Sequence, residues 1–276
     1  MATSVPGMTS PDVLVRAATA HGVTTLTLDS PHNRNALSTP LMTQLLAELA
    51  EAVADDAVRV IVLAHTGPVF CSGADLKETA AAFASGSMPA GMLGDVLAAL
   101  WECPKPVVAK VAGPARAGGL GLIAAADLAV CTQEATFAFT EVRIGVVPAV
   151  ISATVLPRLH PRAAAELYLT GDTFDGRRAA EIGLVTAAVP ADGLDAAVAG
   201  YCDSLVRGAP GALAGVKHLL HRPPATDLRA EIASLSDLSI GYFLSEEGRE
   251  GVLAFWEKRP ARWVPATDDD AAGTER

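Results

Sequence analysis

The sequence predicts an α/β protein in which strands alternate with helices, followed by a mostly helical C-terminal region. Of its 276 residues, 50% are apolar, which is enough to bury one sizeable core. Up to Pro190, short β-rich apolar runs alternate with segments whose apolar residues recur at helical spacing. Beyond Pro190 the pattern is almost entirely helical, which indicates a helical extension after a strand-containing core.

The first elements are predicted from turn and cap residues. The segments 13–18 and 23–28 are β-rich and flank His21-Gly22, a pattern typical of a hairpin. Thr39-Pro40 opens a helix, because threonine is a favoured cap and proline suits the first helical position. The alternation continues through strand 58–64, helix 92–102, strand 106–112, a helix from Gly118 and strand 128–131.

Two glycine-containing turns carry the most chemical information. One spans residues 70–77 and follows the strand predicted at 58–64. The other spans residues 113–121 and follows the strand predicted at 106–112. Each lies where a strand ends and a helical pattern begins, so each can point free backbone N–H groups at a ligand. Two such donors on one carbonyl oxygen form an oxyanion hole, which serves acyl chemistry.

At these turns the chain resembles the crotonase (enoyl-CoA hydratase/isomerase) superfamily. The resemblance runs from about Val13 to Trp263, and it implies a spiral of ββα units with a C-terminal helical trimerisation region. Five motifs in the family's order carry it: Arg34-Asn35-Ala36-Leu37, Ser72-Gly73-Ala74-Asp75-Leu76, the Gly118-Gly119 helix start, Thr140-Glu141-Val142-Arg143-Ile144-Gly145, and Phe255-Trp256-Glu257-Lys258-Arg259.

The predicted organisation has one core and one helical region. Residues 1–12 are a flexible N-terminus, 13–192 the spiral core with the oxyanion hole, 193–264 the C-terminal helical region, and 265–276 a flexible tail. The C-terminal helices are predicted at 193–207, 210–221, 226–240 and 246–258, and the resemblance implies a homotrimer or a dimer of trimers. The segment 79–94 has little periodicity; it is either a mobile lid over an acyl pocket or a poorly specified surface helix.

Three residues are the candidate catalytic groups. The resemblance implies that the N–H groups of Ala74 and Gly118 hold a thioester oxygen, and that Glu141 is the general acid/base. Fixed donors would stabilise the enolate-like oxyanion that forms beside a thioester carbonyl. Four apolar neighbours of Glu141 are expected to desolvate it and raise its pKa: Phe139, Val142, Ile144 and Val146. A surface glutamate paired with Arg143 is the alternative.

One departure from the hydratase pattern leaves the reaction open. Hydratases of the two-glutamate type carry a second carboxylate where this chain has Gly121, and no other acid lies between Gly113 and Ala126. Hydration of a 2-enoyl-CoA by the single glutamate is the favoured interpretation. Δ3,Δ2-isomerisation of an enoyl-CoA by the same glutamate is the second, and an acyl-CoA-binding protein with little catalysis is the third.

The resemblance implies coenzyme A as part of the substrate thioester and no permanently bound cofactor. Residues matching the family's CoA groove are Arg34, Ala36, Ala74, Leu76, Lys77, Phe255 and Lys258. Arg116 and Arg143 are either partners in structural ion pairs at a subunit contact, which we favour, or cations that select an acyl group with a distal carboxylate, as in methylglutaconyl-CoA.

Charge and cysteine usage exclude several function classes. The net charge of −10 argues against nucleic acids and anionic membrane surfaces as partners. The four cysteines have no CxxC spacing, so we expect buried thiols rather than disulfides or a zinc site. The first residues show no basic and apolar secretory pattern, and the most apolar stretch, 118–130, is too short to span a bilayer. We therefore expect a soluble, cytoplasmic protein.

Overall fold

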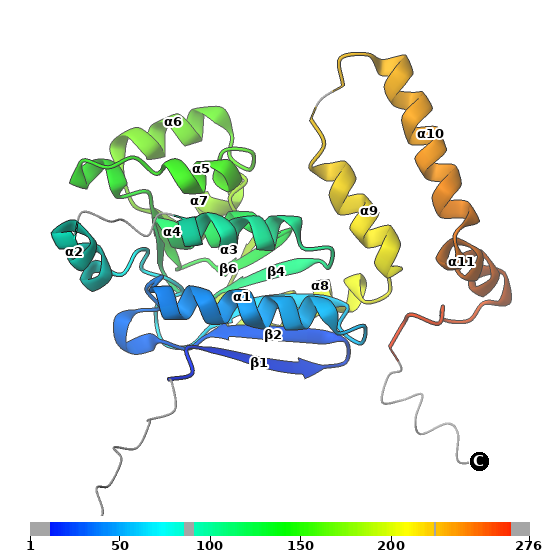
Figure 1. Ribbon diagram of the computed structural model, residues 1–276, viewed down its shortest axis with the longest axis horizontal. Coiled ribbons are helices and arrows are strands. Elements are labelled where there is room, and N and C mark those ends of the chain that lie inside the picture. The colour runs from blue at the N-terminus through cyan, green and yellow to red at the C-terminus, as the bar shows by residue number, and fades with distance from the viewer. Residues whose placement is uncertain (1–11, 86–90, 224, 266–276) are drawn as a thin grey trace, which may run out of the picture.

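Strands from the whole length of the core meet in one six-stranded sheet (Figure 1). The computed structural model describes residues 12–85, 91–223 and 225–265. The sheet order is β1-β2-β3-β4-β6-β9; β1 and β2 are antiparallel and every later pair is parallel. The strands are β1 (Val15–Ala20), β2 (Val23–Leu28), β3 (Val60–His65), β4 (Val107–Val111), β5 (Ala115–Arg116), β6 (Leu128–Thr132), β7 (Thr136–Ala138), β8 (Phe174–Asp175) and β9 (Ala187–Val189).

Helices cover both faces of this sheet, and further helices follow in the C-terminal part of the chain. They are α1 (Thr39–Ala54), α2 (Leu76–Ser85), α3 (Gly91–Glu102), α4 (Gly118–Ala125), α5 (Ala149–Val155), α6 (Pro161–Thr170), α7 (Gly176–Glu181), α8 (Leu194–Leu205), α9 (Pro210–Leu220), α10 (Leu228–Leu244) and α11 (Glu246–Glu257). Three short 3₁₀ helices lie between them: η1 (Pro31–Asn33), η2 (Glu141–Ile144) and η3 (Ala191–Gly193). The α/β class and the helical C-terminal region are as predicted.

Side chains of β3 show why the central strands read as continuous apolar runs. Ile61 and Leu63 point into the main core, which also contains residues of α1, α3 and α4. Val60 and Val62 point the other way and pack against Val198 and its neighbours on α8. A parallel strand that is covered on both faces has no reason to alternate polar with apolar residues.

The predicted hairpin is present, and the predicted helix cap is wrong by one residue. His21 and Gly22 both have positive φ, at 49° and 77°, and join β1 to β2. Ser38, not Thr39, is the cap of α1: its hydroxyl accepts a hydrogen bond from the N–H of Leu41 at 3.4 Å. Ser38 has extended backbone geometry, whereas Thr39 is already helical and is followed by proline at the second helical position.

A second, three-stranded sheet links the glycine turn of residues 113–121 to the segment that precedes Glu141. Its order is β5-β7-β8, with β5 parallel to β7 and β7 antiparallel to β8. The range 79–94 contains most of α2 and the beginning of α3, so its described part is helical; residues 86–90 lie outside the described residues. Of the predicted flexible termini, 1–12 and 265–276, residues 1–11 and 266–276 lie outside the described residues too.

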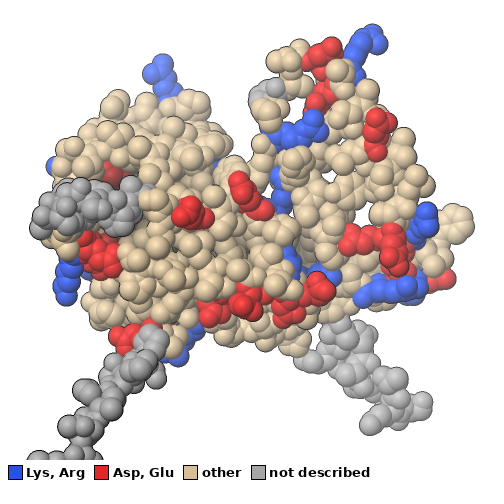
Figure 2. Space-filling model, in the orientation of Figure 1, with Lys and Arg blue, Asp and Glu red and all other residues tan. Residues whose placement is uncertain are grey.

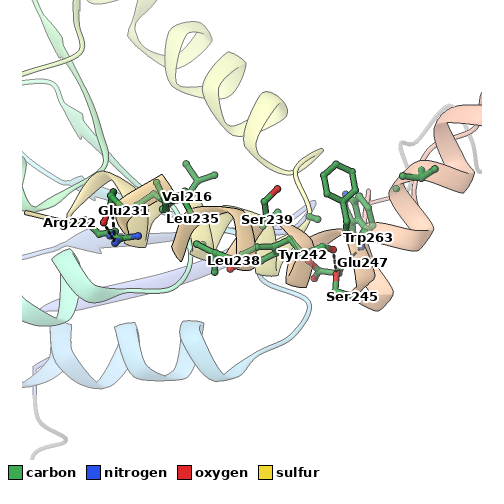
Figure 3. A pocket seen from close by; sticks show the side chains of 18 of the residues that line it. Val216, Arg222, Glu231, Leu235, Leu238, Ser239, Tyr242, Ser245, Glu247 and Trp263 are labelled. Carbon is green, nitrogen blue, oxygen red and sulfur yellow. Dashed lines mark hydrogen bonds and ion pairs between the residues drawn. The ribbon is translucent and has the colours of Figure 1, made fainter. Parts of the chain in front are cut away.

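The last three helices extend away from the sheet; we call residues 210–265 the C-terminal arm (Figure 1). We call the rest of the described chain the body. On the face shown in Figure 2, much of the arm stands apart from the body, and most of the arm's surface there is uncharged. A cavity of about 820 Å³ lies between α9, α10 and α11, with Val216, Leu235 and Trp263 in its lining (Figure 3). The arm therefore encloses little core of its own.

Two further findings concern compartment and thiols. None of the helices in the described part of the chain has the length and apolar character needed to cross a bilayer. The four cysteines are free and buried. Burial raises the pKa of the Cys71 thiol, which lies in the first glycine turn, to about 12, so it is not a reactive thiolate at neutral pH.

Candidate active site

The two glycine turns meet at the ends of adjacent parallel strands. The first follows β3 and the second follows β4, and Cys71 pairs with Ala115 in an isolated parallel bridge. A Cβ on Gly73 would lie 3.0 Å from the Cβ of Ala117 and 3.7 Å from the amide nitrogen of Gly118. The φ of Gly73 is +90°, a conformation that favours glycine. The absent side chain therefore lets the turns come into contact.

The backbone around Gly118 leaves its N–H free for a ligand. Ala117 has φ +48° and ψ −117°, a strained conformation for a residue with a side chain. Gly118 is the first residue of α4, where the N–H has no intrahelical acceptor. Among the described residues, no group accepts a hydrogen bond from the N–H of Gly118 or from that of Ala74. Two unpaired amide donors thus lie on neighbouring turns.

The segment before α1 holds the first turn in place. The N–H of Leu37 donates to the carbonyl of Gly73 at 2.8 Å, and the N–H of Ser72 donates to the carbonyl of Arg34 at 3.0 Å. Arg34 and Asn35 both have positive φ, at 61° and 52°. These contacts explain why the motif at residues 34–37 accompanies the glycine turn in the sequence.

Asn35 is a structural residue of the site that sequence reasoning left without a role. Its side chain is fully buried, accepts a hydrogen bond from the N–H of Ser30 at 2.8 Å, and donates to the carbonyls of Thr66 and Val69 at 3.0 and 2.8 Å. It therefore joins the segment between β2 and α1 to the segment that leads from β3 into the first glycine turn. The only signal in the sequence was its place in the motif.

Glu141 begins η2 and lines a cavity of about 270 Å³ together with Ala74 and Gly118. Its Oε2 atom is buried and has no hydrogen-bond partner among the described residues. Burial raises the pKa of this carboxyl above its usual value. A carboxylate without a partner, beside two free amide donors, can accept a proton from a ligand in the cavity.

The cause of this burial differs from the expectation. Phe139 is buried, but Val142, Ile144 and Val146 are largely exposed, so they do not desolvate Glu141. The alternative partner, Arg143, binds elsewhere. The residues that share the cavity with Glu141 are mainly apolar: Leu37, Met42, Ala74, Asp75, Glu78, Thr79, Leu93, Ala117, Gly118, Val147, Pro148, Ala149, Val150 and Ile151.

Both candidate arginines are engaged in contacts within the chain, but of the two only Arg143 has a described ion pair, as the favoured interpretation expects. The guanidinium of Arg116 donates to the carbonyl of Ala115 at 2.8 Å and to the hydroxyl of Thr136 at 3.0 Å. Arg143 donates to Asp172 at 2.6 Å and to the carbonyl of Thr170 at 3.2 Å. Neither is among the described residues that line the cavity.

The predicted CoA-groove residues fall into two groups. Arg34, Ala36, Leu76 and Lys77 lie on the two segments that hydrogen-bond to each other beside Ala74. Phe255 and Lys258 lie at the end of α11, on the arm, and Phe255 is 82% exposed. Figure 1 places α11 and α2 on opposite sides of the molecule, so one chain does not bring these two residues to Ala74.

Comparison with known proteins agrees with this geometry. A family model described as "Enoyl-CoA hydratase/isomerase" matches residues 18–265. The chain belongs to that family. It is 36% identical to a putative enoyl-CoA hydratase of Thermus thermophilus over 245 residues, which covers 86% of this chain and 95% of the relative.

Other members show the same relationship. A 2,3-dehydroadipyl-CoA hydratase of Escherichia coli is 30% identical over 85% of this chain and 92% of its own. The crystal structure of a putative enoyl-CoA hydratase/isomerase (crotonase) from Legionella pneumophila superposes with a TM-score of 0.82 at 32% identity, and it covers 91% of this chain and 98% of its own. The predicted crotonase fold is thus confirmed, and the family acts on CoA thioesters.

Proposed function

We propose that the protein is an enoyl-CoA hydratase, which adds water to a 2-enoyl-CoA to give a 3-hydroxyacyl-CoA. The observation that carries the proposal is the buried, unpaired Oε2 of Glu141 in a cavity that also contains Ala74 and Gly118. Membership of the enoyl-CoA hydratase/isomerase family and the names of the relatives support it.

The amide donors and the carboxylate have separate tasks in the proposed reaction. The N–H groups of Ala74 and Gly118 donate to the thioester oxygen and stabilise the negative charge that develops there. The carboxylate of Glu141 takes a proton from water while the water oxygen bonds to C3 of the enoyl group. The same carboxyl then delivers that proton to C2, which collapses the enolate and leaves Glu141 ionised. No second acid is required for this cycle.

The experiment that tests the proposal is Glu141→Gln with 2-enoyl-CoA substrates. We expect turnover to fall by at least about 10²-fold, because a positioned acid/base contributes that much, with CoA-ester affinity nearly unchanged. Mass detection of the product, heavier by one water, measures the reaction. Undiminished activity in this variant would mean that the proton-transfer group lies elsewhere. Gly118→Pro is a less clean test, since it deletes an amide donor but also perturbs the helix start.

Isomerisation is the second candidate. A single carboxylate that takes a proton from one carbon and returns it to another suffices for a Δ3,Δ2 shift, and the cavity holds Glu141 with no acid at Gly121. Incubation with 3-enoyl-CoA distinguishes the two when the 3-enoyl and 2-enoyl esters are separated by chromatography. An isomerase forms the 2-enoyl ester, which has the mass of the starting ester, whereas hydration adds the mass of one water. An acyl-CoA-binding protein with little catalysis, the third candidate, would bind both esters and convert neither.

We also propose that the protein assembles as a homotrimer or a dimer of trimers. Large apolar side chains of the arm are exposed in the single chain, among them Ile240, Phe243 and Phe255. Surfaces of this kind mark sites of association. In such an assembly, Phe255 and Lys258 would reach the CoA part of a substrate only from a second copy of the chain.

A further inference from the structure

Ile151 occupies the wall of the cavity beside the proposed catalytic groups. It lies on α5, its side chain is buried, and it lines the same cavity as Glu141 and Gly118. No local sequence pattern pointed to it, because α5 is short and follows an exposed loop. Its position depends on how α5 packs against α4.

The packing of Ile151 against α4 is tight. A Cβ on Gly121, one turn after Gly118, would lie 2.7 Å from Cγ2 and 3.1 Å from Cβ of Ile151. The same Cβ would lie 3.3 Å from a methyl group of Leu97 on α3. Thr154, one turn further along α5, donates from its hydroxyl to the carbonyl of Gly121 at 3.2 Å. Ile151 thus has little room to retreat from the cavity toward α4.

From this geometry we infer that Ile151 determines specificity by limiting the bulk of the acyl group that fits beside the oxyanion donors. The inference rests on the proposed acyl-CoA function and names the substrate class more closely: 2-enoyl-CoA esters with short apolar acyl chains. Most other lining residues are also apolar, with Leu37, Met42 and Leu93 among them; besides Glu141, the side chains with charged or hydroxyl groups are those of Asp75, Glu78 and Thr79. An apolar acyl chain is therefore matched in polarity and limited in size by Ile151.

The experiment measures kcat/KM for crotonyl-CoA, 2-hexenoyl-CoA and 2-octenoyl-CoA. Ile151→Ala removes the γ and δ carbons and opens space contiguous with the cavity. We expect the octenoyl/crotonyl ratio of kcat/KM to rise by about tenfold or more, since methylene-sized differences in apolar pockets change discrimination by roughly 10–200-fold. Ile151→Val, which is less disruptive to folding, should change the ratio in the same direction by a smaller factor.

Val155→Ala is the matched control. Val155 is fully buried on the same helix but is not among the described residues that line the cavity. Its truncation creates a comparable void in the core and should leave the octenoyl/crotonyl ratio at the wild-type value. A ratio that stays within about threefold of wild type in both Ile151 variants, or that rises equally in Val155→Ala, overturns the inference.

Failure of this inference is distinguishable from failure of the proposed function. A wild-type protein that hydrates crotonyl-CoA, with variants of unchanged ratio, overturns the role of Ile151 alone. A wild-type protein that converts none of the esters overturns the hydratase proposal; calorimetry with butyryl-CoA and octanoyl-CoA then tests Ile151 by affinity. In that case Ile151→Ala should tighten octanoyl-CoA relative to butyryl-CoA, and an unchanged affinity ratio contradicts the inference.

Discussion

Helices α4 and α10 are both rich in apolar side chains but differ in how far they are buried. All eight residues of α4 are buried, whereas none of the seventeen residues of α10 is buried. The surroundings of α4 come from its own chain, through α3, α5 and the sheet, but α10 touches mainly α11. The core around α4 is therefore closed within one chain, whereas the arm leaves apolar surface open.

This difference divides the candidate site as well. Ala74, Gly118 and Glu141 all belong to the body and line one cavity in a single chain. Phe255 and Lys258 belong to the arm and lie far from that cavity. The groups of the proposed proton chemistry therefore lie together in a single chain. The proposed CoA contact depends in part on the arm, whose apolar surface is exposed.

The first prediction compares equivalent truncations in the two regions. Leu120→Ala in α4 should lower the free energy of unfolding by about 2–5 kcal/mol, because it leaves a void in a fully buried helix. Ile240→Ala in α10 should cost less than about 1 kcal/mol in an isolated chain, since Ile240 is 55% exposed there. Urea unfolding at several protein concentrations measures both.

Assembly would change the result expected for Ile240→Ala. If α10 is covered by another copy, the unfolding midpoint of wild type depends on protein concentration. Ile240→Ala should weaken that dependence, because more of the variant unfolds from separate chains, and should shift light scattering toward smaller species. A wild-type protein that stays monomeric at micromolar concentration, with a stable arm, would contradict the proposed trimer. If Leu120→Ala and Ile240→Ala lower the free energy of unfolding equally, and at every protein concentration, the proposed difference between α4 and α10 is wrong.

The elements predicted correctly were those determined by local pattern. The apolar run before Ala64 and the turn at His21-Gly22 each predicted a feature that the structure contains. The cap at Thr39 failed because serine and threonine stand side by side, and their backbone geometry alone distinguishes the cap from the first helical residue. Local preference could not decide between them.

The placement of the candidate site residues could be predicted in part, where they belong to a motif. Ala74, Gly118 and Glu141 line one cavity because the ends of two strands and η2 converge there. The resemblance carried by the motifs predicted that these three residues would lie together. The burial of Glu141 was attributed to its sequence neighbours, most of which are exposed. Ile151 was missed altogether, because its contact with Gly121 joins two helices whose spacing follows from tertiary packing.

The second prediction concerns the stability cost of the proposed catalytic group. Burial raises the pKa of Glu141, so the folded state disfavours its ionised form. The resulting loss of stability is absent below the unfolded-state pKa of about 4.3 and grows as pH rises through the folded-state pKa. Glu141→Gln should therefore be more stable than wild type at pH 7, by about 0.5–2 kcal/mol.

Denaturant unfolding at pH 7 and pH 4 measures this effect, and the difference between the two proteins should vanish at the lower pH. Glu134→Gln is the control, because Glu134 is exposed. A Gln variant that is less stable than wild type at pH 7 would mean that the carboxylate of Glu141 has a stabilising partner.

The smallest expected effect lies where the arm meets the body. His221, at the end of α9, stacks on Trp101 of α3 with ring centroids 4.1 Å apart, and Arg158 lies 4.6 Å from the same indole. Burial, followed by the charges of Arg158 and Lys217, lowers the pKa of His221. A lowered folded-state pKa means that the contact is fully stabilising above the unfolded-state value of about 6.5 and weakens as pH falls below it.

We expect wild type to lose slightly more thermal stability than His221→Asn between pH 7.5 and 5.5. The difference should stay under about 1 kcal/mol, because the imidazole is partly open to solvent, which screens the neighbouring charges. His32→Asn, at an exposed position, controls for titration that does not involve the arm. Scanning calorimetry across this range measures the effect. If both variants follow wild type, the stacked contact does not respond to pH. The arm has other contacts with the body, among them the ion pair between Lys217 Nζ and the carboxylate of Asp127 at 2.6 Å.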